Sequence, residues 1–211
     1  MRNLTEANLT DAVLARVEGC KDPRTKQILT SVIRHVHAVV REVELTPGEW
    51  LEAIRFLTST GQKCDENRQE FILLSDTLGV TMLVDAIANR RSAGGTESSV
   101  LGPFYVEGAP PRETGVLKPV SYPIPTDGPV GKFLGVQNRH PFRPAHTHFI
   151  VSAPGFRRVV TELFAEGDRY LDSDPVFGVK SSLVVDFKPD GKDSRDRTHH
   201  LVEYDFVLEP E

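Results

Sequence analysis

HPFRPAHTHFIV, residues 140–151, contains two histidines two positions apart, His146 and His148, which lead into an alternating run. In a β-strand, residues two apart point to the same face of the sheet, so both imidazoles could reach one metal ion. The pattern therefore favours a strand with a metal-binding face over the alternative of two ordinary polar residues on a strand. It does not identify the metal, because zinc, copper, iron and manganese sites all use imidazole ligands.

A second pair with the same spacing, His35 and His37, serves as an internal control. It lies in a segment whose apolar residues recur at helical spacing. Residues two apart on a helix point about 200° from each other, because each residue turns the helix by about 100°. We therefore expect these two to be ordinary surface or interface histidines.

The chain after residue 96 shows a period of two, which indicates antiparallel strands. Asp190 to Arg197 is charged and reads as a hairpin-like loop. We expect a β-sandwich or barrel over residues 96–211. The alternating residues are Phe149 and Val151, then Val159, Thr161 and Leu163, then Leu183, Val185 and Phe187, then Val202, Tyr204, Phe206 and Leu208.

Residues 1–95 show the helical period instead. Asp22-Pro23 opens one helix, and Thr46 to Glu49 forms a capping box that opens the next. A third helical region covers residues 66–89, with a break expected at Gly79. Residues 90–96 resemble a linker. Because helical periodicity precedes it and strand periodicity follows it, the chain is predicted to be α+β. The apolar surface of the helices could pack on the second half, on a copy of itself, or on both.

The bulk composition narrows the class of protein. The chain has 211 residues and a net charge of −5, and an acidic protein lacks the basic face that nucleic-acid binding needs. It contains no membrane-spanning apolar run of about eighteen residues and no apolar signal region at its N-terminus. Its two cysteines form no motif, so we expect a cytoplasmic protein.

Tyr122 begins a loop, YPIPTDGP, with three prolines within seven positions. Such a loop is rigid, because each proline fixes its own φ angle. The tyrosine could be a structural corner. It could also be a phenolate ligand, since a bound metal ion can ionise a coordinating group. Spacing alone favours the structural interpretation.

Four segments together resemble the intradiol ring-cleavage dioxygenases: TESSVLGPFYVEGAP (96–110), VSYPIPTDGPVG (120–131), HPFRPAHTHF (140–149) and EGDRYLDSDPVFGVKSSLVVDF (166–187). The helical segment FILLSDTLGVTMLVDAI (71–87) is similar to the hydroxyquinol and catechol 1,2-dioxygenase branch. The resemblance extends over nearly the whole chain, with the motifs in the family's order.

The resemblance implies an N-terminal helical region that forms a homodimer contact, followed by a catalytic β-sandwich. It implies one non-haem Fe(III) held by two tyrosinates and two histidines. The reaction cleaves a catechol-type diol between its hydroxyl-bearing carbons, with both atoms of O₂ incorporated, in the catabolism of aromatic compounds. Tyr122, His146 and His148 match three of the metal ligands, Tyr122 also moves a proton, and Arg143 matches the arginine that faces the substrate ring. The positions that match the family's substrate pocket are Leu73, Asp76, Val100, Leu101, Gly102, Pro103, Phe104, Tyr105, Ile124, Pro125 and Val176.

The chain departs from the family near residues 112–118, where several family strands and the first tyrosine ligand are missing. Tyr105, Tyr170 and Tyr204 lack the sequence context of that ligand. Glu162 stands where relatives often have Gln or His, and its carboxylate could pair with Arg143 and weaken the field of that cation. We therefore expect weak activity or none.

Three alternatives stay open at this stage. The chain is an incomplete version of a normal enzyme, or it is a shortened homologue without turnover that acts as a dimerisation partner. A different histidine–metal β protein, such as a cupin-like enzyme, would not explain the YPIP and GPFYVEGAP segments. Between hydroxyquinol and catechol as substrate, the polar Asp76 favours hydroxyquinol, whose extra hydroxyl needs a partner.

Overall fold

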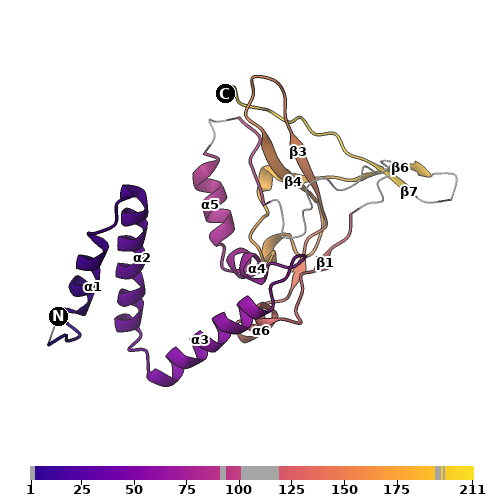
Figure 1. Ribbon diagram of the computed structural model, residues 1–211. Helices are drawn as coiled ribbons and strands as arrows, with labels where there is room; N and C mark the ends of the chain where they lie inside the picture. The colour runs from indigo at the N-terminus through magenta and orange to yellow at the C-terminus, as the bar shows by residue number, and fades with distance from the viewer. Residues whose placement is uncertain (1–2, 91–93, 101–118, 193–195, 197) are drawn as a thin grey trace. The chain divides into compact units, whose positions relative to one another are not determined.

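A computed structural model describes residues 3–90, 94–100, 119–192, 196 and 198–211. The chain divides into two compact units, Met1–Phe56 and Leu57–Glu211, which are described separately below. Helices come first and several small sheets follow, which confirms the predicted α+β class (Figure 1).

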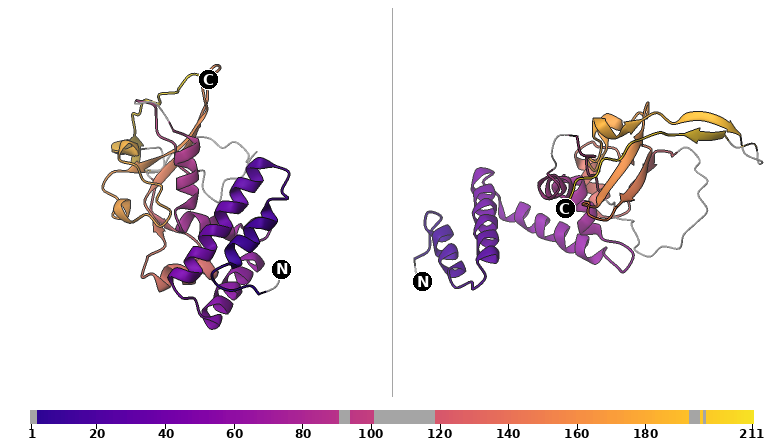
Figure 2. Two further views of the ribbon diagram at one scale, coloured as in Figure 1. Left: turned by 90° about the vertical axis from the view of Figure 1, so that its left-hand side faces the viewer. Right: turned by 90° about the horizontal axis from the view of Figure 1, so that it is seen from above.

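The first unit contains α1 (Leu9–Val17), α2 (Pro23–Glu42) and the start of α3 (Pro47–Gln62). Helices α1 and α2 lie side by side in all views (Figures 1 and 2). The predicted start of α2 is confirmed: Asp22 is the N-cap, and its carboxylate accepts a hydrogen bond from the Thr25 N–H at 2.6 Å. Sequence reasoning did not predict α1.

The predicted capping box at the start of α3 is also confirmed. The Thr46 N–H donates to Glu49 Oε2 at 2.9 Å, and the Glu49 N–H donates to Thr46 Oγ1 at 3.3 Å. The hydrogen bonds from Thr46 lower the pKa of Glu49. Two backbone donors that the helix itself cannot satisfy thus find partners.

The two histidines of α2 have different hydrogen-bond partners. His37 Nδ1 lies 2.9 Å from Thr10 Oγ1 of α1, whereas His35 Nδ1 donates to the Ser31 carbonyl at 2.8 Å. The prediction that these are ordinary histidines is consistent with this arrangement.

In the second unit, α4 (Glu70–Thr77) and α5 (Val80–Ala88) meet at a bend of 78°. The break falls at Gly79 as predicted, and the φ of Gly79 is +73°, a left-handed conformation that glycine adopts without steric cost. No single helix among the described residues is long and apolar enough to cross a membrane, and α4 and α5 meet the length and composition criteria only as a bent pair.

Three small sheets make up the β part (Figure 1). The first pairs β1 (Tyr122–Pro123) with β2 (Phe142–Arg143). The second contains β3 (His146–Val151), β4 (Val159–Ala165) and β5 (Val184–Val185), with β3 and β4 antiparallel and β4 and β5 parallel. The third is the hairpin of β6 (Lys188–Lys192) and β7 (Thr198–Leu201), where the charged hairpin was predicted. Helix α6 (Pro129–Val136) and the 3₁₀ turns η1 (Leu171–Ser173) and η2 (Ser181–Leu183) complete the unit.

The predicted strand at residues 202–208 is wrong, because the structure has no regular strand there. The segment instead packs on the central sheet: Val202, Tyr204 and Phe206 contact the buried cluster of Leu163, Phe164 and Leu183. The alternation of apolar residues therefore indicates that one side of this segment packs against the core. It does not report a ladder of backbone hydrogen bonds, which also requires a neighbouring strand.

The core of this unit runs along β4. Val159, Leu163 and Phe164 are at most 2% exposed, so close packing of these side chains holds the strand in place. This anchoring fixes the neighbouring strand β3, and with it the two histidines.

Candidate metal centre

The β3–β4 hairpin brings three metal-binding types of side chain together. His148 lies directly opposite Glu162 in the antiparallel register, and residues opposite each other project to the same face. The rings of His146 and His148 lie 4.9 Å apart, centroid to centroid. One ligand atom from each of His146, His148 and Glu162 lies within 4.8 Å of the other two. The two histidines thus share a face, as the strand pattern predicted.

His146 presents one defined nitrogen to this cluster. Its Nδ1 lies 2.7 Å from the Pro144 carbonyl, and because a carbonyl can only accept, Nδ1 holds the proton. Its Nε2 then carries the lone pair, which accepts a hydrogen bond from Arg143 Nη1 at 3.1 Å and lies 3.3 Å from the Tyr122 hydroxyl and 3.6 Å from Glu162 Oε1. Burial, and next the charge of Arg143, lower the pKa of His146 and keep the ring neutral. A neutral ring with a fixed tautomer is the form that binds metals.

Tyr122 reaches the cluster from β1, where it pairs with Arg143 of β2. Burial raises the pKa of its phenol, so a metal ion must displace a proton to bind the oxygen. The ring of Tyr122 lies 5.4 Å from the ring of His146.

The loop that follows Tyr122 is held by a buried ionic network. Glu70 is fully buried and accepts the Val130 N–H of α6 at 3.1 Å. Arg68 donates to Glu70 and to Asp127, in each case at 2.8 Å. These contacts hold the C-terminal end of the proline loop, and the pairing of β1 with β2 holds Tyr122 at its start. Tyr122 therefore loses little freedom when it meets the histidines.

These donors fit a single metal ion. Ligand bonds of about 2.1 Å place neighbouring ligand atoms about 3.0–3.4 Å apart in octahedral or tetrahedral geometry. Glu162 Oε1 lies 3.2 Å from His148 Nδ1 and 3.6 Å from His146 Nε2, close to this spacing. Phenol, carboxylate and imidazole are donors that suit iron. An ion here would compete with Arg143 Nη1, which lies 3.1 Å from His146 Nε2.

Arg143 is enclosed between two carboxylates. Its Nη1 and Nη2 donate to the two oxygens of Glu162 at 3.0 and 2.9 Å, and its Nε donates to Asp174 Oδ1 at 3.2 Å. Burial alone would lower the pKa of Arg143, but Glu162 and then Asp174 raise it on balance, so the guanidinium stays charged. The predicted pairing of Arg143 with Glu162 is confirmed, and the cation is neutralised by its neighbours.

Asp174 was not anticipated from the sequence. Besides Arg143, it accepts the backbone N–H groups of Val176 and Gly178, at 3.3 and 3.0 Å. It therefore shapes the loop after η1 and holds Arg143 at the same time.

The predicted substrate-pocket residues fall into two groups. Leu101 to Tyr105 lie outside the described residues. Among the others, Leu73, Asp76, Val100, Ile124 and Val176 are buried and Pro125 is partly buried. Val100 and Val176 pack together with Met82. Burial raises the pKa of Asp76, and the charge of Arg143 acts on it in the opposite direction.

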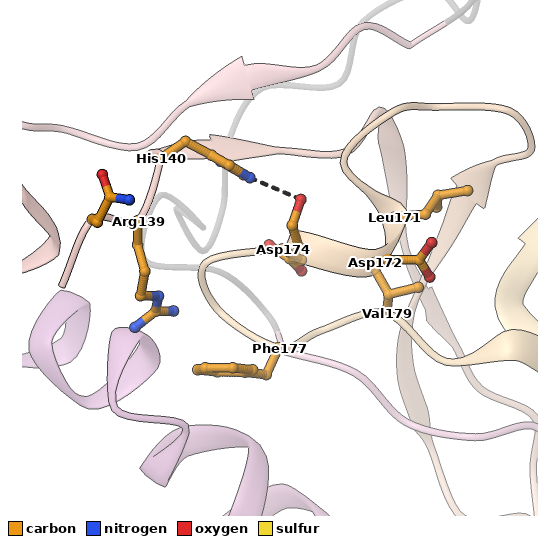
Figure 3. A pocket seen from close by; sticks show the side chains of 9 residues that line it. Arg139, His140, Leu171, Asp172, Asp174, Phe177 and Val179 are labelled. Carbon is orange, nitrogen blue, oxygen red and sulfur yellow. Dashed lines mark hydrogen bonds between the residues drawn. The ribbon is translucent and has the colours of Figure 1, made fainter.

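Asp174 also lines a cavity of about 490 Å³ (Figure 3). His140 crosses part of its wall and reaches Ser173 Oγ at 2.8 Å. None of the predicted substrate-pocket residues that the structure describes lines this cavity. Its lining residues are Asn138, Arg139, His140, Leu171, Asp172, Ser173, Asp174, Phe177 and Val179.

The remaining described tyrosines have other partners. Tyr170 stacks on Phe142 with 5.1 Å between ring centroids, and the Tyr204 hydroxyl donates to the Ser182 carbonyl at 3.2 Å. Tyr105 lies outside the described residues. Of the described tyrosines, Tyr122 is the one whose hydroxyl lies against the histidines.

Comparison with known proteins assigns the class. Residues 22–96 match the family model of the catechol dioxygenase N terminus, and residues 112–210 match the dioxygenase model. The chain belongs to the intradiol ring-cleavage dioxygenases, as the motifs indicated.

The similar relatives include hydroxyquinol enzymes. The chain is 40% identical to a 6-chlorohydroxyquinol 1,2-dioxygenase of Cupriavidus pinatubonensis, covering 100% of this chain and 99% of that protein. The structure of hydroxyquinol 1,2-dioxygenase from Pseudomonas putida DLL-E4 is 41% identical, with a TM-score of 0.88 over 98% of this chain and 99% of that one. The catechol 1,2-dioxygenase of Acinetobacter radioresistens, 20% identical with a TM-score of 0.78, covers 100% of this chain and 95% of that one and shares the fold.

The alignment with the Cupriavidus protein also shows an internal difference. It spans 279 positions, and this chain has 211 residues, so at least 68 positions hold a residue of the relative only. Because the alignment covers 100% of this chain and 99% of the relative, the difference lies within the chain. This supports the expected absence of an internal segment.

Proposed function

We propose that this chain binds an aromatic ortho-diol next to one non-haem Fe(III) ion, at a site built for intradiol cleavage with O₂. The observation on which this rests is that Tyr122, from one sheet, and His148, from another, both lie next to His146: the Tyr122 hydroxyl is 3.3 Å from His146 Nε2, and the two imidazole rings are 4.9 Å apart. The family matches and the hydroxyquinol relatives support the reaction class.

The roles of the side chains follow from their chemistry. When bound, the ferric ion makes the diol reactive toward O₂, and both oxygen atoms enter the ring-opened product. His146 and His148 offer neutral nitrogens to the ion. Tyr122 offers its oxygen, and its phenolate is the base that takes a proton from a diol hydroxyl, since a phenolate regains a proton readily when its pKa is raised by burial.

Hydroxyquinol is the proposed diol, with catechol as the alternative. Asp76 is a buried carboxyl on α4, and it could accept a hydrogen bond from the third hydroxyl of hydroxyquinol. The other predicted pocket positions, Leu73, Val100 to Tyr105, Ile124, Pro125 and Val176, would line the ring on its apolar sides.

We expect turnover to be weak or absent in this chain. The family uses a second tyrosinate that this chain lacks, and Arg143 is already neutralised by Glu162 and Asp174. An arginine paired in this way supplies little field to charge that develops on a substrate.

The test is reconstitution of the purified protein with Fe(III), followed by visible absorption and O₂ uptake with hydroxyquinol. A visible tyrosinate-to-iron band together with slow or undetectable O₂ uptake is the expected result. A colourless protein without stoichiometric iron would remove the proposal. Family-like turnover would contradict the expected impairment and mean that another residue replaces the lost tyrosine.

A second candidate function is dimerisation without catalysis, either as a homodimer or with a longer relative. An apolar stripe on α2 supports it: Ile28, Val32, Val36 and Val39 recur every three or four residues and are 46–55% exposed. Co-expression with a full-length hydroxyquinol dioxygenase and size-exclusion chromatography test this candidate. Mixed dimers are its expected result, and separate homodimers of each protein would exclude pairing with the relative.

A further inference from the structure

We propose that the Glu162 carboxylate is the fourth protein ligand of the metal ion, in place of the tyrosinate that this chain lacks. This inference rests on the metal site of the proposed function. It adds to that site a residue that neither the family resemblance nor the relatives assign as a ligand.

Position is the first argument. Glu162 is fully buried on β4 and faces His148 across the hairpin. Its Oε1 is the atom nearest to both imidazoles, 3.2 Å from His148 Nδ1 and 3.6 Å from His146 Nε2. The first separation lies within the range of about 3.0–3.4 Å expected for two ligands of one ion, and the second lies slightly above it, so the carboxylate needs only a small shift.

The hydrogen bonds of Glu162 leave room for an ion. Oε2 accepts from Arg143 Nη2 at 2.9 Å and lies 3.1 Å from Ser99 Oγ, whose single hydrogen is shared with the Gly178 carbonyl at 3.0 Å. Oε1 accepts from Arg143 Nη1 at 3.0 Å and keeps a second lone pair on the side of the histidines. An ion bound through Oε1 would displace Arg143 Nη1, which lies 3.0 Å from Oε1 and 3.1 Å from His146 Nε2. Arg143 Nη2 and Ser99 would still hold the carboxylate through Oε2, which is how ligating carboxylates are usually supported.

Charge is the second argument. With two neutral imidazoles and a single phenolate, an ion here would meet one anionic oxygen. A glutamate ligand restores the two anionic oxygens that two tyrosinates provide, and anionic oxygen donors suit a hard ferric ion. A site of two histidines, one phenolate and one carboxylate thus matches the charge of the site that the family resemblance implies.

The competing explanation is that Glu162 serves Arg143 alone. Asp174 offers a matched control, because it is also a buried carboxylate that accepts from Arg143, at 3.2 Å, but its other partners are backbone N–H groups. Substituting Asp174 by Asn disturbs Arg143 as Glu162→Gln does, without changing a group that faces the histidines.

The experiment measures Zn²⁺ affinity by competition with a chromophoric chelator, for the wild type, Glu162→Gln and Asp174→Asn. Zn²⁺ is the probe because it does not change oxidation state. We expect Glu162→Gln to raise the Kd about 100-fold and Asp174→Asn to raise it by less than about threefold, since loss of a ligand weakens a site at least as much as loss of a supporting residue. Circular dichroism checks that both variants are folded.

Equal losses in the two variants, or no loss in Glu162→Gln, would overturn the ligand role. The infrared difference spectrum of zinc-loaded minus zinc-free wild type gives a test that needs no variant: a shifted carboxylate stretch supports the role, and its absence overturns it. A wild type that binds neither Zn²⁺ nor Fe(III) would remove the proposed function itself. A wild type with the tyrosinate–iron band but an unshifted carboxylate would remove only the role of Glu162.

Discussion

Arg143 and Glu162 meet through two parallel hydrogen bonds of 3.0 and 2.9 Å, with their side chains 2% and 0% exposed. A buried pair of this kind contributes little net stability while intact, because both charges lose their hydration. Removing one partner is costly, since the other charge then stays buried without a counter-ion. Removing Arg143 is expected to cost more than removing Glu162, because Arg143 is the counter-ion of two buried carboxylates.

Substituting Arg143 by Met is expected to lower the free energy of unfolding by about 3–5 kcal/mol, because Glu162 and Asp174 are then left without their cation. Urea unfolding measures the change. Arg157→Met is the control: its pair with Glu209 is 41% exposed on the arginine side, so a loss under about 1 kcal/mol is expected. Similar losses of unfolding free energy in the two variants would show that the buried ion pairs of Arg143 matter no more for stability than an exposed pair.

Gly178 is the second point at which this cluster can be tested. A Cβ there would lie 2.9 Å from Arg143 Nη2 and 3.1 Å from Glu162 Oε2, so Gly178→Ala must displace the ion pairs. We expect a loss of about 1–3 kcal/mol in unfolding free energy. Gly135→Ala in α6 meets nothing within 4 Å and should stabilise the helix by about 0.5–1 kcal/mol. An unchanged stability of Gly178→Ala would mean that the cluster shifts freely.

The phenol of Tyr122 is expected to give the iron-loaded protein its colour. Tyr122→Phe removes the oxygen that lies 3.3 Å from His146 Nε2, so the visible band should disappear from the absorption spectrum. Tyr170→Phe, whose ring stacks on Phe142, should leave the band unchanged. A band that persists in Tyr122→Phe would assign the colour to another tyrosine.

Asp127 should make the stability of the fold decrease as the pH becomes acidic. Hydrogen bonds from Lys63 and Arg68 lower its pKa from 3.8 to about 2. A carboxyl with a lowered pKa stabilises the fold above its unfolded value, and that contribution is lost as the pH falls from about 4 to about 2. The urea midpoint of Asp127→Asn should therefore fall less than that of the wild type between pH 7 and pH 3. Identical decreases would show that these hydrogen bonds are not kept in solution.

Local chemistry made the starts of α2 and α3, the break between α4 and α5, and the histidine pair predictable. Asp22, Thr46 and Gly79 each have a short-range role, capping or breaking a helix, that depends only on neighbouring residues. His146 and His148 share a face because a strand alternates, whatever lies around it. The strand predicted at residues 202–208 failed because pairing depends on a distant segment that the pattern does not specify.

Of the two carboxylates that pair with Arg143, one was predicted from the sequence and the other was not. The pairing of Glu162 was anticipated, but its contact with the histidines was not. A turn centred on Gly155, where φ is +77°, would have indicated that contact, because it places Glu162 opposite His148. No local signal points to Asp174, since its role depends on how a loop folds back onto β2.

The turn between β3 and β4 also has a consequence for how this site could change. Deleting or inserting one residue there would shift the pairing by one position and place Thr161 or Leu163 opposite His148. A hydroxyl or a methyl group would then meet the imidazole in place of a carboxylate. Turn length is therefore as strict a determinant of the donor set as the identity of the donors themselves, and a one-residue indel there could abolish metal binding while leaving both histidines in the chain.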